Sequence, residues 1–154
     1  MRCVGMGEEP IEFGFKYHRL SPREKGALLD RLRRELMGME DIVFAYVHGG
    51  FVERDEFRDV DVAIWIRDPE KAFYYTVDFS AKLEIKFKLP IDVHVLNEAP
   101  LSFKYHVFTK GVLLFSKDED FRRRKLDEVV RKYIDLKQLE KYASRRGLRG
   151  TCQH

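Results

Sequence analysis

Two periodicities of apolar positions divide the 154-residue chain into helices and strands. Apolar residues spaced by three and four positions, which share one face of a helix, predict helices over about 22–37, 69–87, 99–110 and 118–142. Short apolar runs rich in β-branched and aromatic residues predict strands over about 42–48, 59–66, 90–96 and 112–115. We therefore expect an α/β fold, with helices on the faces of a small mixed sheet and a long C-terminal helix.

The boundaries of the first helix are the best marked. Ser21, Pro22 and Glu24 match an N-cap, a first-turn proline and a capping-box glutamate, and Gly38 is a typical stop. A chain of this length can bury one full core. We expect one domain over 21–143, an N-terminal extension over 1–20 with a further edge strand at 11–17, and a basic tail over 144–154.

The helix over 69–87 is aromatic on several sides. Its core-facing stripe can be formed by Phe73 with Val77, or by Phe79 with Leu83. Aromatic surface that the core does not cover would pack under the C-terminal helix or meet a partner. The sequence leaves these alternatives open.

Composition and charge narrow the function classes. The hydrophobic fraction of 44% is ordinary for a globular protein. A formal net charge of +3 does not indicate a nucleic-acid partner, and the basic run 122–125 is most simply a solvated helix face. Cys3 and Cys152 have no metal-ligand spacing. No signal peptide or membrane-length apolar run is present, so we expect a cytoplasmic protein without a membrane partner.

A glycine pair and two aspartates flank the loop between the first two strands. Asp59 and Asp61 are two positions apart, so both side chains leave the strand on one face, about 6–7 Å apart at the backbone. Converging carboxylates repel one another, and Mg²⁺ would offset this while binding phosphate oxygens. Gly49 and Gly50 remove side chains where the backbone turns, and a helix starting there would direct N–H groups at an anion. This combination predicts a metal–triphosphate site.

A third carboxylate strengthens this prediction. Asp92 lies in the otherwise apolar third strand, where a carboxylate is costly without a partner, and beside Asp59 and Asp61 it would complete a cluster. His48 and His94 are nearby in the pattern. We interpret His48 as a strand-end residue with a satisfied hydrogen bond, and contact with phosphate or with metal-bound water is the alternative. We interpret His94 as a neighbour or core residue, because Mg²⁺ prefers oxygen ligands, and ligation is the alternative.

Arginines in the loop offer a contact for phosphate. Arg54 and Arg58 precede the paired aspartates, and a planar guanidinium suits a triphosphate. Arg54 is our candidate, although acidic neighbours at 53, 55 and 56 could neutralise it.

Any single motif has a simpler interpretation, since an Asp-x-Asp alone is commonly a turn followed by a solvated strand position.

Taken together, the motifs resemble those of the DNA polymerase beta-type nucleotidyltransferase superfamily, and most closely its minimal nucleotidyltransferases. That signature is Gly-Ser, a spacer of about ten residues, Asp-x-Asp and a later lone Asp. Here it is matched by Gly49-Gly50, Asp59 with Asp61, and Asp92. Further similar segments are 96–100, 110–115 and 131–136, so that the resemblance covers roughly residues 22–140.

The resemblance implies transfer of a nucleoside monophosphate, AMP from ATP, to a hydroxyl acceptor on a protein. Asp59 and Asp61 would bind the Mg²⁺ that carries the triphosphate, and all three aspartates would bind a second Mg²⁺. Asp92 would also help to generate the attacking oxygen. The glycine pair and Arg54 would hold the phosphates. The implied partner is a small helical HEPN-type protein, in an antitoxin pair.

One departure keeps other classes open. Gly50 stands where the family has a serine, whose hydroxyl helps to hold the phosphates. The first alternative is therefore an inactive protein of this fold that acts by binding a HEPN-type partner, and failure to bind Mg²⁺–ATP would favour it. The second is a glycosyltransferase, which also uses Asp-x-Asp with a metal. It ranks last, because neither the glycine pair nor Asp92 has a role there.

Overall fold

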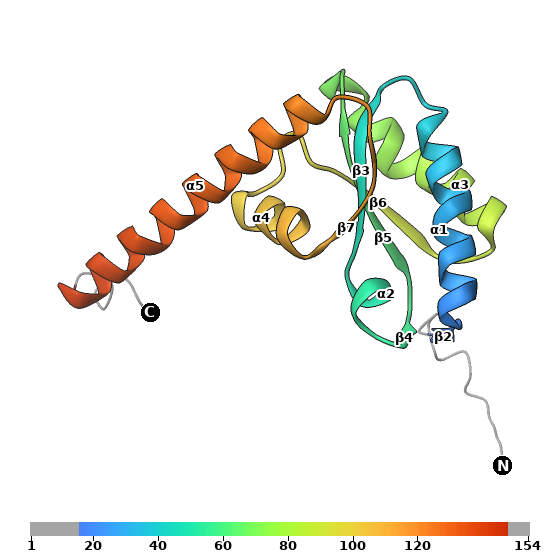
Figure 1. Ribbon diagram of the computed structural model, residues 1–154, viewed down its shortest axis with the longest axis horizontal. Coiled ribbons are helices and arrows are strands. Elements are labelled where there is room, and N and C mark those ends of the chain that lie inside the picture. Colours follow the sequence, from blue (N-terminus) through green and yellow to red (C-terminus); the bar gives the residue numbers. More distant parts are fainter. Residues whose placement is uncertain (1–15, 148–154) are drawn as a thin grey trace, which may run out of the picture.

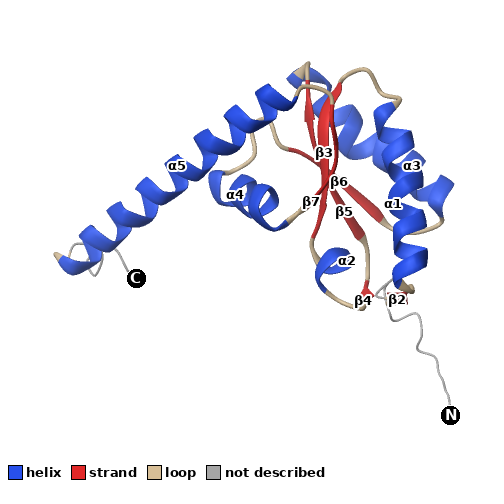
Figure 2. Ribbon diagram, in the orientation of Figure 1, coloured by secondary structure: helices blue, strands red, loops and turns tan. Residues whose placement is uncertain are grey.

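Four strands form a mixed sheet in the computed structural model, which describes residues 16–147. The strands are β3 (Ile42–His48), β5 (Val60–Ile66), β6 (Ile91–Val95) and β7 (Val112–Ser116), and their order is β6-β5-β3-β7. β3 runs antiparallel to both β5 and β7, whereas β5 and β6 are parallel. The α/β fold class with a mixed sheet is therefore confirmed (Figure 2).

Helices cover both faces of this sheet (Figure 1). On one face lie α1 (Pro22–Met37) and α3 (Ser80–Phe87), and on the other lie α4 (Leu101–Lys110) and the start of α5 (Glu119–Arg145). The first face carries the larger core, to which α1 contributes Leu28, Leu32 and Leu36. The second face is more aromatic and includes Phe44, Tyr46, Phe108 and Val129.

The capping signals of the first helix act as the sequence predicts. Ser21 Oγ accepts a hydrogen bond from the Glu24 N–H, and the Glu24 carboxylate accepts one from the Ser21 N–H. Together they satisfy two N–H groups that the helix start would otherwise leave open. Gly38 caps the C-terminus, where its N–H bonds to the carbonyl of Arg34. The helix is thus fixed at both ends.

The segment predicted as one helix over 69–87 is helical but not uniform. It consists of the 3₁₀ turn η2 (Pro69–Lys71), the π-helical stretch η3 (Tyr74–Phe79) and α3. Phe79 and Leu83 are buried, while Phe73 is 73% exposed. Of the two possible stripes, the fold uses Phe79 with Leu83, because the wider π turn rotates the residues before it relative to α3.

The loop between β3 and β5 contains three short elements. α2 (Gly50–Glu53) begins at the glycine pair, and β4 (Glu56–Phe57) pairs antiparallel with β2 (His18–Arg19). The predicted helix start after the first strand is therefore confirmed. Most of the edge strand expected at 11–17 lies outside the described residues, as does the tail from 148 onward.

The long C-terminal helix is attached to the domain by its first half. Arg122 Nη1 donates to the Tyr46 hydroxyl at 2.7 Å, and its guanidinium also pairs with Glu119. The Arg122 side chain is 13% exposed, so the expectation that this basic run is a solvated face is wrong at this residue. Tyr133 stacks on Tyr105 of α4, with ring centroids 3.8 Å apart. Beyond Tyr133, the helix extends away from the sheet (Figure 1).

No helix within the described residues has the length and apolar character needed to cross a membrane.

Candidate metal and nucleotide site

Sheet register brings the acidic residues together. His48, Asp61 and Asp92 face each other on the adjacent strands β3, β5 and β6. Residues directly opposite in neighbouring strands put their side chains on the same face. The lone Asp92 is therefore beside the Asp-x-Asp strand, as the sequence pattern predicts. This part of the site follows from the parallel pairing of β5 with β6.

A compact set of ligand atoms lies at this point. Asp61, Asp92 and His94 each offer one atom that could bind a metal ion, and these three atoms lie within 4.8 Å of one another. We call these residues, with Asp59 beside them, the carboxylate cluster. Within it, His94 Nε2 is 3.5 Å from Asp61 Oδ1. The hydrogen bond with Asp61 raises the pKa of His94 above its ordinary value, against the opposing effect of burial. Sequence reasoning placed His94 on the correct face but interpreted it as a neighbour of the ligands. Its signal was the two-residue spacing from Asp92.

Asp59 immediately precedes β5 and is half-buried. It does not belong to the set of ligand atoms above. Burial raises the pKa of Asp59, and the negative charges of Asp61 and Asp92 raise it further. Asp59 is therefore close enough to be repelled by both carboxylates, and a divalent cation would offset this repulsion. Its role as a metal ligand remains a prediction.

The glycine turn packs directly against Asp61. Gly49 has φ +81° and ψ −157°, a conformation essentially restricted to glycine. A Cβ atom at Gly49 would lie 2.4 Å from Asp61 Oδ2. At Gly50, the nearest atom to an added Cβ would be Arg54 Cζ at 3.9 Å, so this position has room for a side chain. The absence of a side chain is therefore required at the first glycine and not at the second.

α1 holds the short helix after this turn in place. Lys25 Nζ donates to the carbonyl oxygens of Phe51 and Arg54, at 2.7 and 2.8 Å. These carbonyls lie at the end of α2, where intrahelical donors are lacking. Arg54 itself is exposed and forms no ion pair within residues 16–147. Its guanidinium lies beside Gly50, which is where the sequence predicts a phosphate contact.

Aromatic rings form the wall of the site on the α4 side. The ring centroid of Phe103 lies 5.5 Å from that of His48 and 5.4 Å from that of His94. His106 Nε2 lies 3.9 Å from a carboxylate oxygen of Glu53 and so links α4 to α2. Burial lowers the pKa of His48. Sequence reasoning missed Phe103 and His106, because only the tertiary packing of α4 brings them here.

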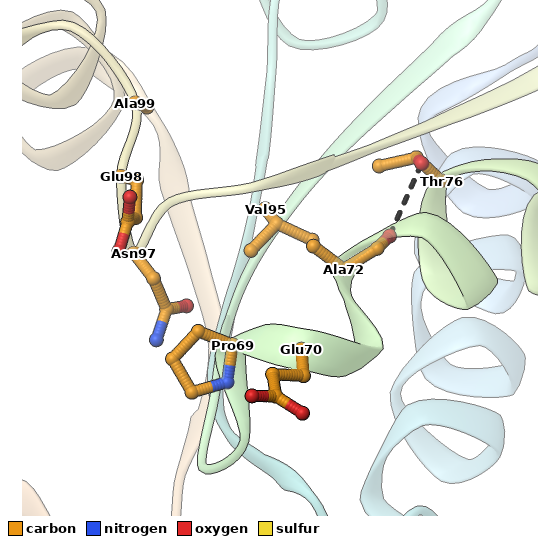
Figure 3. Close-up of a pocket in the computed structure, with 8 residues that line it drawn as sticks. All are labelled: Pro69, Glu70, Ala72, Thr76, Val95, Asn97, Glu98 and Ala99. Carbon is orange, nitrogen blue, oxygen red and sulfur yellow. Dashed lines mark hydrogen bonds between the residues drawn. The ribbon is translucent and has the colours of Figure 1, made fainter.

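A separate cavity lies at the other end of β5 and β6 (Figure 3). Its volume is about 530 Å³, and it is lined by Pro69, Glu70, Val95 and Asn97, among others. The charged side chains in its lining are Glu70 and Glu98. Two carboxylates without a cation do not suit a triphosphate. The lining of this cavity therefore offers no positive charge for a phosphate group.

The residues at the cluster fit a divalent cation. Carboxylate oxygens from Asp61 and Asp92, with Asp59 beside them, are hard donors of the kind that Mg²⁺ and Mn²⁺ bind. At Asp59, the charges of Arg58 and His94 oppose the repulsion from Asp61 and Asp92. A bound ion would supply the missing positive charge and could bridge to phosphate oxygens next to the glycine turn.

Solved structures with the same fold come from toxin–antitoxin complexes. One chain of a complex between a tri-AMPylated HEPN toxin of Shewanella oneidensis and an MNT antitoxin superposes with a TM-score of 0.60 at 16% identity, covering 80% of this chain and 98% of that one. A chain of a toxin–antitoxin structure with AMP-PNP gives 0.56 at 19% identity, covering 83% and 98%. A chain of the MntA–HepT complex gives 0.56 at 17%, covering 82% and 97%. At these identities the likeness concerns the fold.

Sequence comparison identifies the family. No protein of curated function matches the chain. The model of the family described as polymerase beta, nucleotidyltransferase, matches residues 30–120. That range includes the glycine pair, the Asp-x-Asp motif and Asp92, together with all four strands of the sheet. The chain therefore belongs to the polymerase beta-type nucleotidyltransferase family.

Proposed function

We propose that this protein transfers AMP from ATP to a hydroxyl group of a HEPN-type helical partner, as an antitoxin of the minimal nucleotidyltransferase kind. The observation that carries the proposal is the meeting of Asp61, Asp92 and His94 beside a glycine turn. The structural likeness to an antitoxin bound to an AMPylated HEPN toxin supports the choice of acceptor. The likeness to a complex holding AMP-PNP supports the choice of donor.

Each residue of the site would have a distinct role in this reaction. Asp59 and Asp61 would hold the Mg²⁺ that accompanies the triphosphate, and Asp92 with both of them a second Mg²⁺. Such ions would neutralise charge on the attacking and leaving oxygens. The glycine turn and Arg54 would orient the phosphates, and Asp92 would orient the acceptor hydroxyl and accept its proton. The hydroxyl oxygen would form a bond to the α-phosphorus as the bond to the β-phosphate bridging oxygen breaks, and pyrophosphate would leave.

ATP labelled at either the α- or the γ-phosphate tests this reaction. The protein is incubated with Mg²⁺ and a lysate of its source organism, and we expect a labelled protein with α-labelled ATP and none with γ-labelled ATP. Asp61→Asn and Asp92→Asn should abolish the label. Asp78→Asn, which removes an exposed carboxylate on η3, is the matched control and should retain it. A protein labelled from γ-labelled ATP, and not from α-labelled ATP, in dependence on the added protein would instead indicate a kinase and contradict the proposal.

A second candidate is favoured by one specific residue. Gly50 lacks the serine hydroxyl of the family pattern, which leaves the backbone as the phosphate contact at this position. The protein would then act by binding its HEPN-type partner without transferring a nucleotide. Absence of label, together with absence of Mg²⁺–ATP binding in calorimetry, would contradict the enzyme proposal and favour this candidate.

A further inference from the structure

His94 brings a nitrogen donor into the carboxylate cluster. It lies two residues after Asp92 on β6, so both side chains leave the sheet on the face that carries Asp61. One ligand atom from each of these three residues lies within 4.8 Å of the other two. Donors of two chemical kinds therefore converge on one point, which a site for Mg²⁺ alone does not require.

The spacing of the donors fits a shared ion. His94 Nε2 lies 3.5 Å from Asp61 Oδ1. Charge-assisted N–H···O bonds are typically about 2.7–2.9 Å long. By contrast, two ligands about 2.1 Å from one ion and at right angles to each other lie about 3 Å apart, and wider angles separate them further. The observed gap is at the long end of a direct hydrogen bond, and it is also the separation expected of two ligands of one metal.

A second feature of this face points independently to a ligand. His48 lies directly opposite Asp61 across the β3–β5 ladder and is 6% exposed. Its Nε2 atom is buried and has no hydrogen-bond partner within residues 16–147. The His48 and His94 ring centroids are 5.7 Å apart. An unpartnered buried nitrogen is costly, and an occupant of the neighbouring site with its ordered water would satisfy it.

We propose that His94 Nε2 is a direct ligand of the ion held by Asp61 and Asp92, and that this imidazole makes the site selective for first-row transition-metal ions such as Mn²⁺ over Mg²⁺. Mg²⁺ is held by oxygen ligands in a rigid octahedron, whereas imidazole suits the first-row transition ions. The inference deepens the proposed function, since it specifies which ion serves that site. His94 is then the residue that determines metal specificity.

Mn²⁺ bound to the full-length protein without nucleotide tests this assignment. Electron spin-echo envelope modulation detects the nitrogen of an imidazole bound to Mn²⁺, and we expect a ¹⁴N modulation from the unmodified protein. Labelling histidine with ¹⁵N should remove the ¹⁴N lines without any substitution. His94→Gln should abolish the nitrogen modulation. His18→Gln, which alters a histidine of β2 outside the set of ligand atoms, is the matched control and should leave it unchanged.

Affinities provide the second measurement. Loss of an outer-sphere partner typically costs about 10- to 100-fold in metal affinity, so His94→Gln should weaken Mn²⁺ binding by at least about tenfold. Its Mg²⁺ affinity, measured by calorimetry, should change far less. A far-ultraviolet circular dichroism spectrum that matches the unmodified protein establishes that the variant is folded.

Two results would overturn the assignment. One is bound Mn²⁺ without nitrogen modulation in the unmodified protein, and the other is modulation that survives in His94→Gln. Neither measurement uses ATP or an acceptor, so an absence of AMP transfer leaves the metal assignment standing. Conversely, AMP transfer without nitrogen modulation would preserve the proposed function and remove His94 from the ligand set.

Discussion

Gly49 occupies a backbone conformation that other residues adopt only with strain, of about 1–3 kcal/mol. Gly49→Ala should destabilise the protein by about that amount, and the new Cβ should also displace the Asp61 carboxylate, because the two would be 2.4 Å apart. We expect metal binding to be lost, as measured by Mn²⁺ titration beside denaturant unfolding. Gly147 also has a positive φ but open space around it, so Gly147→Ala should bind metal normally.

Gly50 offers the opposite case, since a side chain has room there. Gly50→Ser should place a hydroxyl beside the glycine turn, which we propose binds phosphate. A hydrogen bond to a charged group contributes about 1.5–3 kcal/mol, so affinity for Mg²⁺ and a non-hydrolysable ATP analogue should rise about tenfold or more. Gly50→Ala adds the methyl carbon without the hydroxyl and is the control. Equal affinities of the serine and alanine variants in calorimetry would contradict this role.

Individual residues of the site were predictable to different degrees. Alternation along a strand is enough to put Asp92 and His94 on one face, and the apolar surroundings of Asp92 mark it as unusual. Whether His94 reaches Asp61 depends on the register of β6 against β5, which no local pattern specifies. That is why the sequence predicts a cluster of the carboxylates and leaves the role of His94 undecided.

At the scale of elements, Glu119 pairs within α5 with Arg122, the residue that donates a hydrogen bond to the Tyr46 hydroxyl of β3. The Arg122 guanidinium holds the pKa of Glu119 down, to about 2 from an ordinary value of 4.5. A carboxyl whose pKa is lowered by folding adds stability that is complete above the unfolded pKa and is lost as the pH falls through the folded one. The contribution of Glu119 should therefore be present above pH 4.5 and disappear toward pH 2.

Replacing the Glu119 carboxylate should weaken the dependence of the free energy of unfolding on pH in the acid range. In denaturant unfolding between pH 2 and 6, Glu119→Gln is expected to lower the free energy of unfolding above pH 4.5 and to reduce its slope below that value. Glu140→Gln, which removes an exposed glutamate of the same helix, should retain the slope of the unmodified protein. If the free energy of unfolding falls with the same slope below pH 4.5 in both variants, the Arg122 contact does not stabilise the fold.

Among the elements, regular helices and strands were predictable and irregular ones were not. Capping residues marked α1, and apolar runs marked the four strands of the sheet. The π-helical turn over Tyr74–Phe79 has no sequence signature, because it is the tertiary packing of Tyr75 and Phe79 that selects the wider turn. β2 and β4 are two residues each, too short to produce a periodic pattern.

At the scale of the whole molecule, we expect the carboxylate cluster to lower the stability of the metal-free protein and to raise it when a divalent cation is bound. Burial raises the pKa of Asp59, and the charges of Asp61 and Asp92 raise it further, so its ionised form is unfavourable in the metal-free protein. Asp59→Asn should therefore stabilise the metal-free protein, by no more than about 1 kcal/mol because the group is partly exposed. With saturating Mg²⁺ the unmodified protein should become the more stable of the two. A ligand at 100 times its Kd adds about 2.7 kcal/mol to the free energy of unfolding of the protein that binds it.

Thermal and denaturant unfolding with Mg²⁺ or with a chelator measure this crossover. Asp78→Asn, outside the site, should show no dependence on the metal beyond that of the unmodified protein. A metal-free Asp59→Asn variant that is less stable than the unmodified protein would mean that Asp59 serves the fold more than it serves a ligand.

The extended part of α5 also has a hydrodynamic consequence. A helix of 27 residues is about 40 Å long, and its second half lies outside the body of the domain (Figure 1). Such a projection increases friction with the solvent without adding mass. A monomer should therefore elute early from a size-exclusion column and resemble a larger species. Light scattering or sedimentation equilibrium, which do not depend on shape, would give the number of chains directly.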